Sequence, residues 1–317
     1  MTSRTATRAI GAAVLLLAVL AALCGCAGPV PSPPPSAVLS SEGSSSAPTD
    51  GTAAASDGRV VVGVTQGRSD SAADVFALTV ENTTEEELAV RSAVLRSPAF
   101  RGDVVWEGDT TVPPGSTRDL RVPVPDFTCP LTERSLVLTV DYGIGGVDAS
   151  ATLVPLDPFM VIERLSDGDC HEKAVAAVVD IRLSDDVVVV GSGPSATAAL
   201  SLVLRPADGL GDGFDDGFDD GRVTIVSVDA TTLLSPDDGS PRWDVGETVS
   251  VGDDPRTVTL TAAPARCDAH AIAEDKLGTV LQVRVRLLDG TEGPVSVAAS
   301  PGLRSALYSF ITDACSA

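Results

Sequence analysis

Apolar and polar residues alternate along most of the chain beyond residue 58. The alternating runs are short, and Gly, Asp, Pro and Ser separate them about every ten residues. A period of two is typical of β-strands with one buried face, and long amphipathic helical patterns are scarce. We therefore predict an all-β fold in which stacked sheets each bury one face. The clearest predicted strands are residues 60–64, 75–80, 88–95, 136–142, 198–204, 223–228, 258–260 and 280–287.

The two halves of this region carry related features in the same order. Pro158–Leu165 is a short helix-like segment that leads to Cys170, and its counterpart Pro301–Ile311 leads to Cys315. An earlier cysteine in each half comes shortly before a predicted strand. This repetition predicts an internal duplication and two related β-sandwich domains. The predicted domains are residues 58–172 and 173–317.

Aromatic residues make up only 3% of the chain, so the cores must be built mainly from Val, Leu, Ile and Ala. Trp106 and Trp243 each precede the first cysteine of their half. We expect these two residues to be the largest packing groups of the two domains.

The N-terminal segment has the pattern of an export signal. Arg4 and Arg8 precede an apolar run, Ile10–Leu23, which ends at Leu23-Cys24-Gly25-Cys26. The run is shorter than the ~20 residues that span a bilayer. The segment resembles the lipobox of bacterial lipoproteins, in which the cysteine after a small residue is diacylated and becomes the first mature residue. This resemblance implies a signal peptide at residues 1–25, lipidation of Cys26 and anchoring at the outer side of the cell membrane.

Residues 26–57 change to Pro, Ser, Ala and Gly, a composition that cannot bury enough apolar surface to fold. We interpret this segment, which begins with the lipidated cysteine, as a disordered tether between the lipid and the folded part.

The chain is strongly acidic, with a formal net charge of −22. Removing the signal takes away Arg4 and Arg8 and leaves 20 basic residues against 44 acidic ones, a charge of −24. Such a surface disfavours nucleic acid as a partner. Lys173 and Lys276 are the only lysines, which we interpret as coding bias.

Four cysteines remain after the signal and the lipidation site are set aside, and an even number in an exported chain predicts disulfides. Four cysteines allow three pairings. The duplication favours Cys129 with Cys170 and Cys267 with Cys315, because the same staple then recurs in each domain. A crossed pairing, which would lock the two domains together, stays open.

His171 and His270, each close to a cysteine, are the only histidines. A Cys/His metal site would need reduced thiolates, which disulfide formation removes, so we predict no catalytic residue and no cofactor here. A Ser-His-Asp hydrolase would have to use one of these histidines, and the chain has no Gly-x-Ser-x-Gly turn. An unrecognised envelope hydrolase is therefore the weaker alternative.

An Asp- and Gly-rich segment at residues 208–221 offers oxygen ligands for a hard cation. The helix-loop-helix calcium pattern and the β-roll nonapeptide are both absent, which favours a solvated hairpin loop. Calcium binding remains the alternative function. The candidate ligands are Asp208, Asp212, Asp215, Asp216, Asp219 and Asp220.

Taken whole, the chain resembles the uncharacterised secreted lipoproteins of GC-rich Gram-positive bacteria that carry tandem immunoglobulin-like sandwich domains. The resemblance rests on Leu23–Cys26, the Pro/Ser tether, the turn at Thr111–Gly115 and the segment Cys267–Lys276. It implies an outward-facing, membrane-anchored protein and brings no known reaction with it. We expect a non-enzymatic binding or scaffold module whose partner is another envelope protein. The sequence carries no signal for an oligomeric state.

Overall fold

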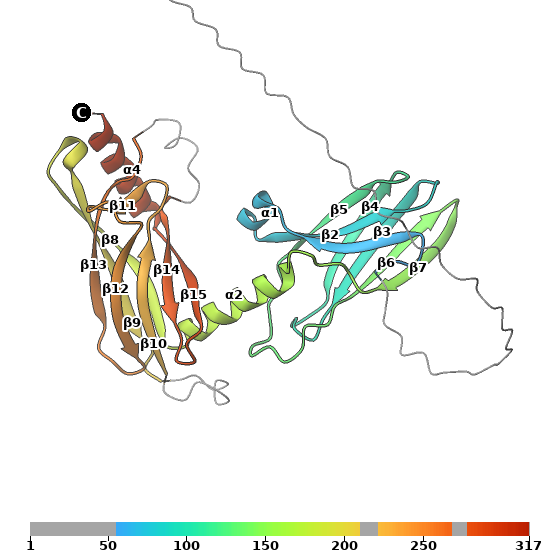
Figure 1. The fold of residues 1–317 in the computed structure, drawn as a ribbon, viewed down its shortest axis with the longest axis horizontal. Coiled ribbons are helices and arrows are strands. Elements are labelled where there is room, and N and C mark those ends of the chain that lie inside the picture. The colour runs from blue at the N-terminus through green and yellow to red at the C-terminus, as the bar shows by residue number, and fades with distance from the viewer. Residues whose placement is uncertain (1–54, 210–220, 268–277, 317) are drawn as a thin grey trace, which may run out of the picture. The chain divides into compact units, whose positions relative to one another are not determined.

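The computed structural model describes residues 55–209, 221–267 and 278–316, and it is mostly β-structure, as the alternation predicts. Figure 1 shows the elements in chain order. The first half holds β1 (Val60–Thr65), α1 (Arg68–Ala72), β2 (Val75–Asn82), β3 (Leu88–Arg96), β4 (Val104–Val112), β5 (Thr117–Pro123), β6 (Val137–Ile144), β7 (Val147–Leu153) and α2 (Val161–Ala176).

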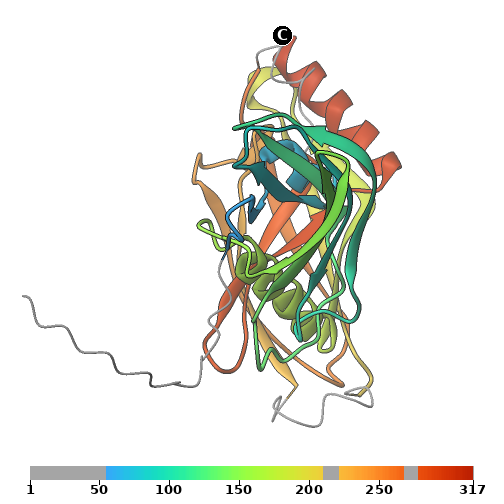
Figure 2. The same cartoon turned by 90° about the vertical axis from the view of Figure 1, so that its right-hand side faces the viewer.

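The second half has a similar succession of strands. It ends in another helix, drawn in red beside the C-terminus (Figures 1 and 2). It holds β8 (Val179–Val190), η1 (Gly193–Ser195), β9 (Thr197–Pro206), β10 (Arg222–Asp229), β11 (Leu234–Pro236), β12 (Arg242–Ser250), β13 (Arg256–Pro264), β14 (Val280–Arg286), β15 (Glu292–Ala298) and α4 (Pro301–Cys315). None of the described helices is long and apolar enough to cross a membrane.

Each half is a pair of antiparallel sheets that share one hydrophobic core. In the first half the sheets have the orders β1-β2-β5 and β4-β3-β6-β7. Inward-facing residues from both sheets, such as Leu78, Leu95 and Leu138, are fully buried in a single cluster. The second half has the orders β11-β13-β9-β8 and β12-β10-β14-β15, again around one cluster. Both halves are therefore β-sandwiches; the immunoglobulin-like subtype stays a prediction.

The two sandwiches have the same topology once the short strand β11 is set aside. Strands β1 to β7 correspond in order to β8, β9, β10, β12, β13, β14 and β15, and each set pairs in the same way. Even the irregularities match, because β3 shifts register between Val90 and Ser92 and β10 shifts between Ile225 and Ser227. The two halves therefore share one strand topology, as two related domains would, and the internal duplication itself stays a prediction.

The tryptophans lie on corresponding strands, β4 and β12. Trp106 is opposite Ala93 and Trp243 is opposite Val228, which occupy matching positions just after the two register shifts. Trp243 is buried and its indole N–H donates to the carbonyl of Thr261 over 2.7 Å. Trp106 is only partly buried at the edge of its core, where Tyr142 is the largest fully buried side chain.

Helix α2 contributes to both hydrophobic clusters. Val161 and Ile162 at its start are buried in the first cluster, whereas Val175 near its end is buried in the second. The boundary predicted between residues 172 and 173 therefore falls inside a continuous helix.

Candidate functional site

Several residues that the sequence singled out lie outside the described part of the chain. These residues include the lipidation candidate Cys26, its tether and His270. Of the six candidate calcium ligands only Asp208 is described, and it is exposed just after β9. Calcium binding by Asp208, Asp212, Asp215, Asp216, Asp219 and Asp220 accordingly stays a prediction.

The remaining four cysteines form two disulfides in the uncrossed arrangement. Cys129 bonds to Cys170 with a Cα–Cα distance of 5.5 Å, and Cys267 bonds to Cys315 with a distance of 5.2 Å. Each bridge ties the helix that follows a sandwich to the segment before one of two corresponding strands, β6 in the first half and β14 in the second. The same staple thus recurs in both halves.

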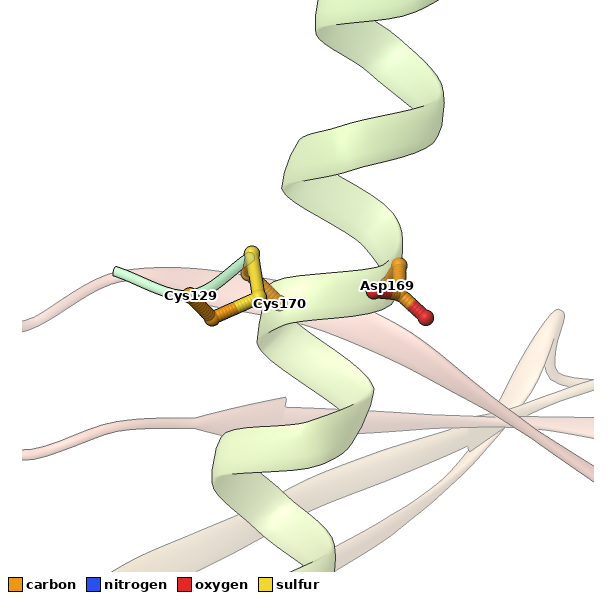
Figure 3. A group of neighbouring side chains, drawn as sticks. All are labelled: Cys129, Asp169 and Cys170. Atoms are coloured by element: carbon orange, nitrogen blue, oxygen red, sulfur yellow. A yellow bond between two sulfur atoms is a disulfide. The ribbon is translucent and has the colours of Figure 1, made fainter. Parts of the chain in front are cut away.

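Asp169 lies beside the first disulfide, at a spacing that would suit a metal ion if the sulfurs were free (Figure 3). The two sulfurs are bonded to each other, however, and a disulfide supplies no thiolate ligand. Asp169 Oδ2 instead pairs with Lys173 Nζ at 2.7 Å. The group is therefore a structural staple and an ion pair in this state of the protein.

Lys173 holds the loop of the first sandwich against α2. Its ammonium pairs with Asp126 and Asp169 and donates to the carbonyl of Phe127 over 3.0 Å. Partial burial works to lower the pKa of Lys173, but the hydrogen bonds and charges of the two carboxylates outweigh it and raise the pKa. The scarcity of lysine offered no hint of this role, because the partners lie four and 47 residues away.

His171 is buried next to Cys170, on the helix α2 that contacts β15. The ring lies against Gly293, and a Cβ added to that glycine would come within 2.8 Å of His171 Cδ2. Neither ring nitrogen has a well-formed hydrogen bond within the described residues. Burial lowers the pKa of His171, although the Gly293 backbone, Glu172 and Asp289 partly oppose this. The described structure therefore favours neutral imidazole here.

A cleft of about 1300 Å³ opens beside this part of α2. Its wall includes the first disulfide, His171, Lys173, Asp289 and Gly293. Among the described residues, its lining contains neither a serine nor an unpaired cysteine, so His171 has no such nucleophile to activate there. Among its charged groups Arg134 and Asp167 pair with each other, whereas Arg101, Lys173 and Glu292 pair with residues outside the lining.

Comparison with known proteins adds little to this description. No protein-family model matches the chain, and no curated protein matches it. Among solved structures, red sea bream transglutaminase is 12% identical with a TM-score of 0.19, covering 76% of this chain and 32% of its own. The chain thus spans about a third of the length of that protein.

Two further solved structures come from chaperone proteins. One is the CsuC–CsuE chaperone–tip adhesion subunit pre-assembly complex of Acinetobacter baumannii Csu pili, at 11% identity and TM-score 0.19, covering 71% of this chain and 91% of that one. The other is the YadV chaperone, at 10% identity and TM-score 0.18, covering 71% and 93%. Likenesses this distant carry no argument about function.

Proposed function

We propose that the protein is an exported, lipid-anchored binding or scaffold module of the cell envelope, and that it is not an enzyme. Cys26 carries the lipid, residues 26–57 form the tether, and the two sandwiches present a surface to another envelope protein. The membrane is thus a partner only through the N-terminal lipid.

The pairing of the cysteines is the observation that best supports this proposal. All four cysteines outside the N-terminal segment are joined, one bridge to each sandwich. Structural disulfides persist in oxidising compartments and are rare in the cytosol. Two bridges in the folded part fit an N-terminal segment with the pattern of an export signal.

The anchor is tested by mass spectrometry of the protein isolated from its host. We expect a mature chain that starts at a diacylated Cys26 and contains no free thiol in its folded part. Cys26→Ser should abolish lipid labelling and release the protein from the membrane fraction. Cys24→Ser is the matched control, two residues away in the same segment, and it should leave labelling intact. An uncleaved N-terminus with free thiols overturns the proposal.

The binding role is tested by crosslinking on intact cells, followed by purification and identification of the crosslinked proteins. We expect one or a few envelope proteins to be recovered with the wild-type protein and to be lost when Cys26→Ser frees it from the membrane. Recovery of no specific partner in repeated experiments counts against a binding module.

A further inference from the structure

Strand β8 ends in four consecutive valines at the edge of its sheet. Among the described residues β8 pairs with β9 on one side only. Val187 packs against the second core. Side chains alternate along a strand, so Val188 and Val190 point to the other face, where they are 61% and 62% exposed. Helix α4 and strand β15 also contact β8, but neither pairs with it, and an unpaired strand edge is a template for another strand.

The corresponding strand of the first sandwich is β1, and its outer edge shows which kind of segment can pair with such a strand. Val64 lies opposite Leu78, which lies opposite Leu120, just as Val187 lies opposite Leu200, which lies opposite Leu260. By this correspondence the end of β1 matches the start of the valine run in β8.

The outer edge of β1 is already occupied by the chain itself. The N–H of Val64 donates to the carbonyl of Leu156 over 2.7 Å, and the N–H of Leu156 donates to the carbonyl of Val62 over 2.9 Å. On the same edge, the N–H of Val62 donates to the carbonyl of Ala55 over 3.1 Å. No described residue makes such backbone bonds to Val187–Val190.

A local difference in sequence explains why one edge is covered and the other is not. Gly63 lets the Leu156 carbonyl approach, since a Cβ there would lie 3.1 Å from that oxygen. In β8 the matching position is a bulge, where the register with β9 shifts between Leu183 and Val187. Such a bulge bends the strand and breaks the ladder, so it separates the valines from the first part of β8.

The bulge also gives the edge an acidic neighbour. Asp185 and Asp186 are exposed there, and neither forms a salt bridge with any described residue. A second copy of a chain with charge −22 would bring like charge to this place, whereas a basic segment would be attracted.

We propose that Val187–Val190 binds an extended, basic segment of a partner protein by strand addition. Main-chain hydrogen bonds would supply the affinity, the exposed valines would contact alternate apolar side chains, and Asp185 with Asp186 would select basic residues. This inference names the contact surface of the proposed binding module, but it does not depend on lipidation of Cys26. Loss of the anchor and loss of this contact are therefore separate results.

The test uses the full-length protein in detergent micelles and synthetic nine-residue peptides. The probe alternates lysine and valine, a second peptide replaces lysine with glutamate, and a third carries N-methyl groups on alternate backbone amides. Fluorescence anisotropy should show saturable binding of the lysine peptide that weakens with added salt. We expect at least tenfold weaker binding of the glutamate and N-methylated peptides.

Variants place the binding on β8. The double variant Val188→Asp with Val190→Asp should bind the lysine peptide at least tenfold more weakly than the wild-type protein. Val147→Asp is the matched control, because it changes a valine that is 67% exposed at the start of the edge strand β7, and it should have no effect. If the double aspartate variant fails to fold, Asp185→Asn with Asp186→Asn provides the second test and should weaken binding and reduce its salt dependence.

Several results overturn the proposal. The first is that the lysine peptide does not bind at millimolar concentration. The second is that the glutamate or N-methylated peptide binds with the same affinity as the lysine peptide. The third is that the β8 variant and the Val147 variant lose the same amount of affinity for the lysine peptide. Sedimentation could also show a dimer that dissociates when Val188→Asp and Val190→Asp are introduced together. In that case a second copy of the chain occupies this edge, and the proposal of a basic partner is wrong.

Discussion

The hydroxyl of Tyr142 donates a hydrogen bond to Asp57 Oδ2 over 3.0 Å, joining residues 85 positions apart. Tyr142 is fully buried in β6, whereas Asp57 is an exposed residue just before β1. Asp57 Oδ1 also accepts the backbone N–H groups of Arg59 and Val60 over 2.8 and 2.9 Å. Asp57 therefore attaches the start of the first sandwich to its core, at the place where the predicted tether ends.

Tyr142→Phe should lower the free energy of unfolding by about 1 kcal/mol, because it removes one hydrogen bond to a carboxylate that water partly solvates. Chemical denaturation at pH 7 measures the loss. Asp57→Asn is the companion variant, since an amide oxygen can still accept both backbone N–H groups and should cost no more. A loss above ~3 kcal/mol for Tyr142→Phe would point to disruption of the core instead.

Stability should also fall in acid through Asp57. Burial works to raise the pKa of Asp57, but the hydrogen bonds from Val60, Arg59 and Tyr142 outweigh it and hold the pKa below its ordinary value of 3.8. A carboxyl group whose pKa is lowered by folding stabilises the folded state fully above pH 3.8. This contribution is lost as the pH falls from 3.8 through the lowered pKa of the folded state. Asp57→Asn should therefore flatten the dependence of unfolding free energy on pH below about 4. An unchanged slope in that variant contradicts the assignment.

Removing either disulfide should destabilise the protein by a similar amount. The bridges close loops of 41 and 48 residues, for which the chain-entropy model gives about 4 kcal/mol each. Cys129→Ala with Cys170→Ala and Cys267→Ala with Cys315→Ala are the two variants to compare by calorimetry. Equal stability of either variant and the wild-type protein contradicts this prediction.

Glycine substitutions should separate a crowded site from an open one near α2. Gly293→Ala would place a methyl group 2.8 Å from His171 Cδ2, so we expect a loss of about 1–3 kcal/mol from overpacking. Gly168→Ala lies on α2 itself with nothing within 4 Å, and it should stabilise the helix by about 0.5–1 kcal/mol. Thermal unfolding of both variants gives the comparison. If both substitutions change the free energy of unfolding in the same direction, His171 does not restrict the space beside Gly293.

His171 should make the protein less stable as the pH falls below 6.5. Burial lowers its pKa from 6.5 in the folded state, with smaller opposing contributions from the Gly293 backbone, Glu172 and Asp289. The unfolded chain then binds a proton more readily, so stability is full above pH 6.5 and is lost as the pH falls through the lowered value. His171→Gln should remove this slope below pH 6.5. NMR titration measures the pKa of the His171 imidazole in the folded protein. A pKa that is not lowered would contradict this prediction.

Local patterns in the chain were enough to predict the fold class and several of its strands, because alternation depends only on which face of a strand each residue occupies. Residues 60–64 and 75–80 are strands as predicted, and the repeated cysteines favoured the pairing that the structure contains. The likeness of the two halves was also predictable from the sequence, since both carry the same features in the same order.

Contacts between distant residues, by contrast, became visible only in three dimensions. Nothing local relates Tyr142 to Asp57 or His171 to Gly293, because such contacts depend on how sheets and helices pack. The free edge of β8 likewise emerges only by comparison with β1, whose outer bonds to Leu156 come from the far end of the first sandwich. A strand's own pattern specifies its faces, whereas the occupancy of its edges depends on the rest of the fold.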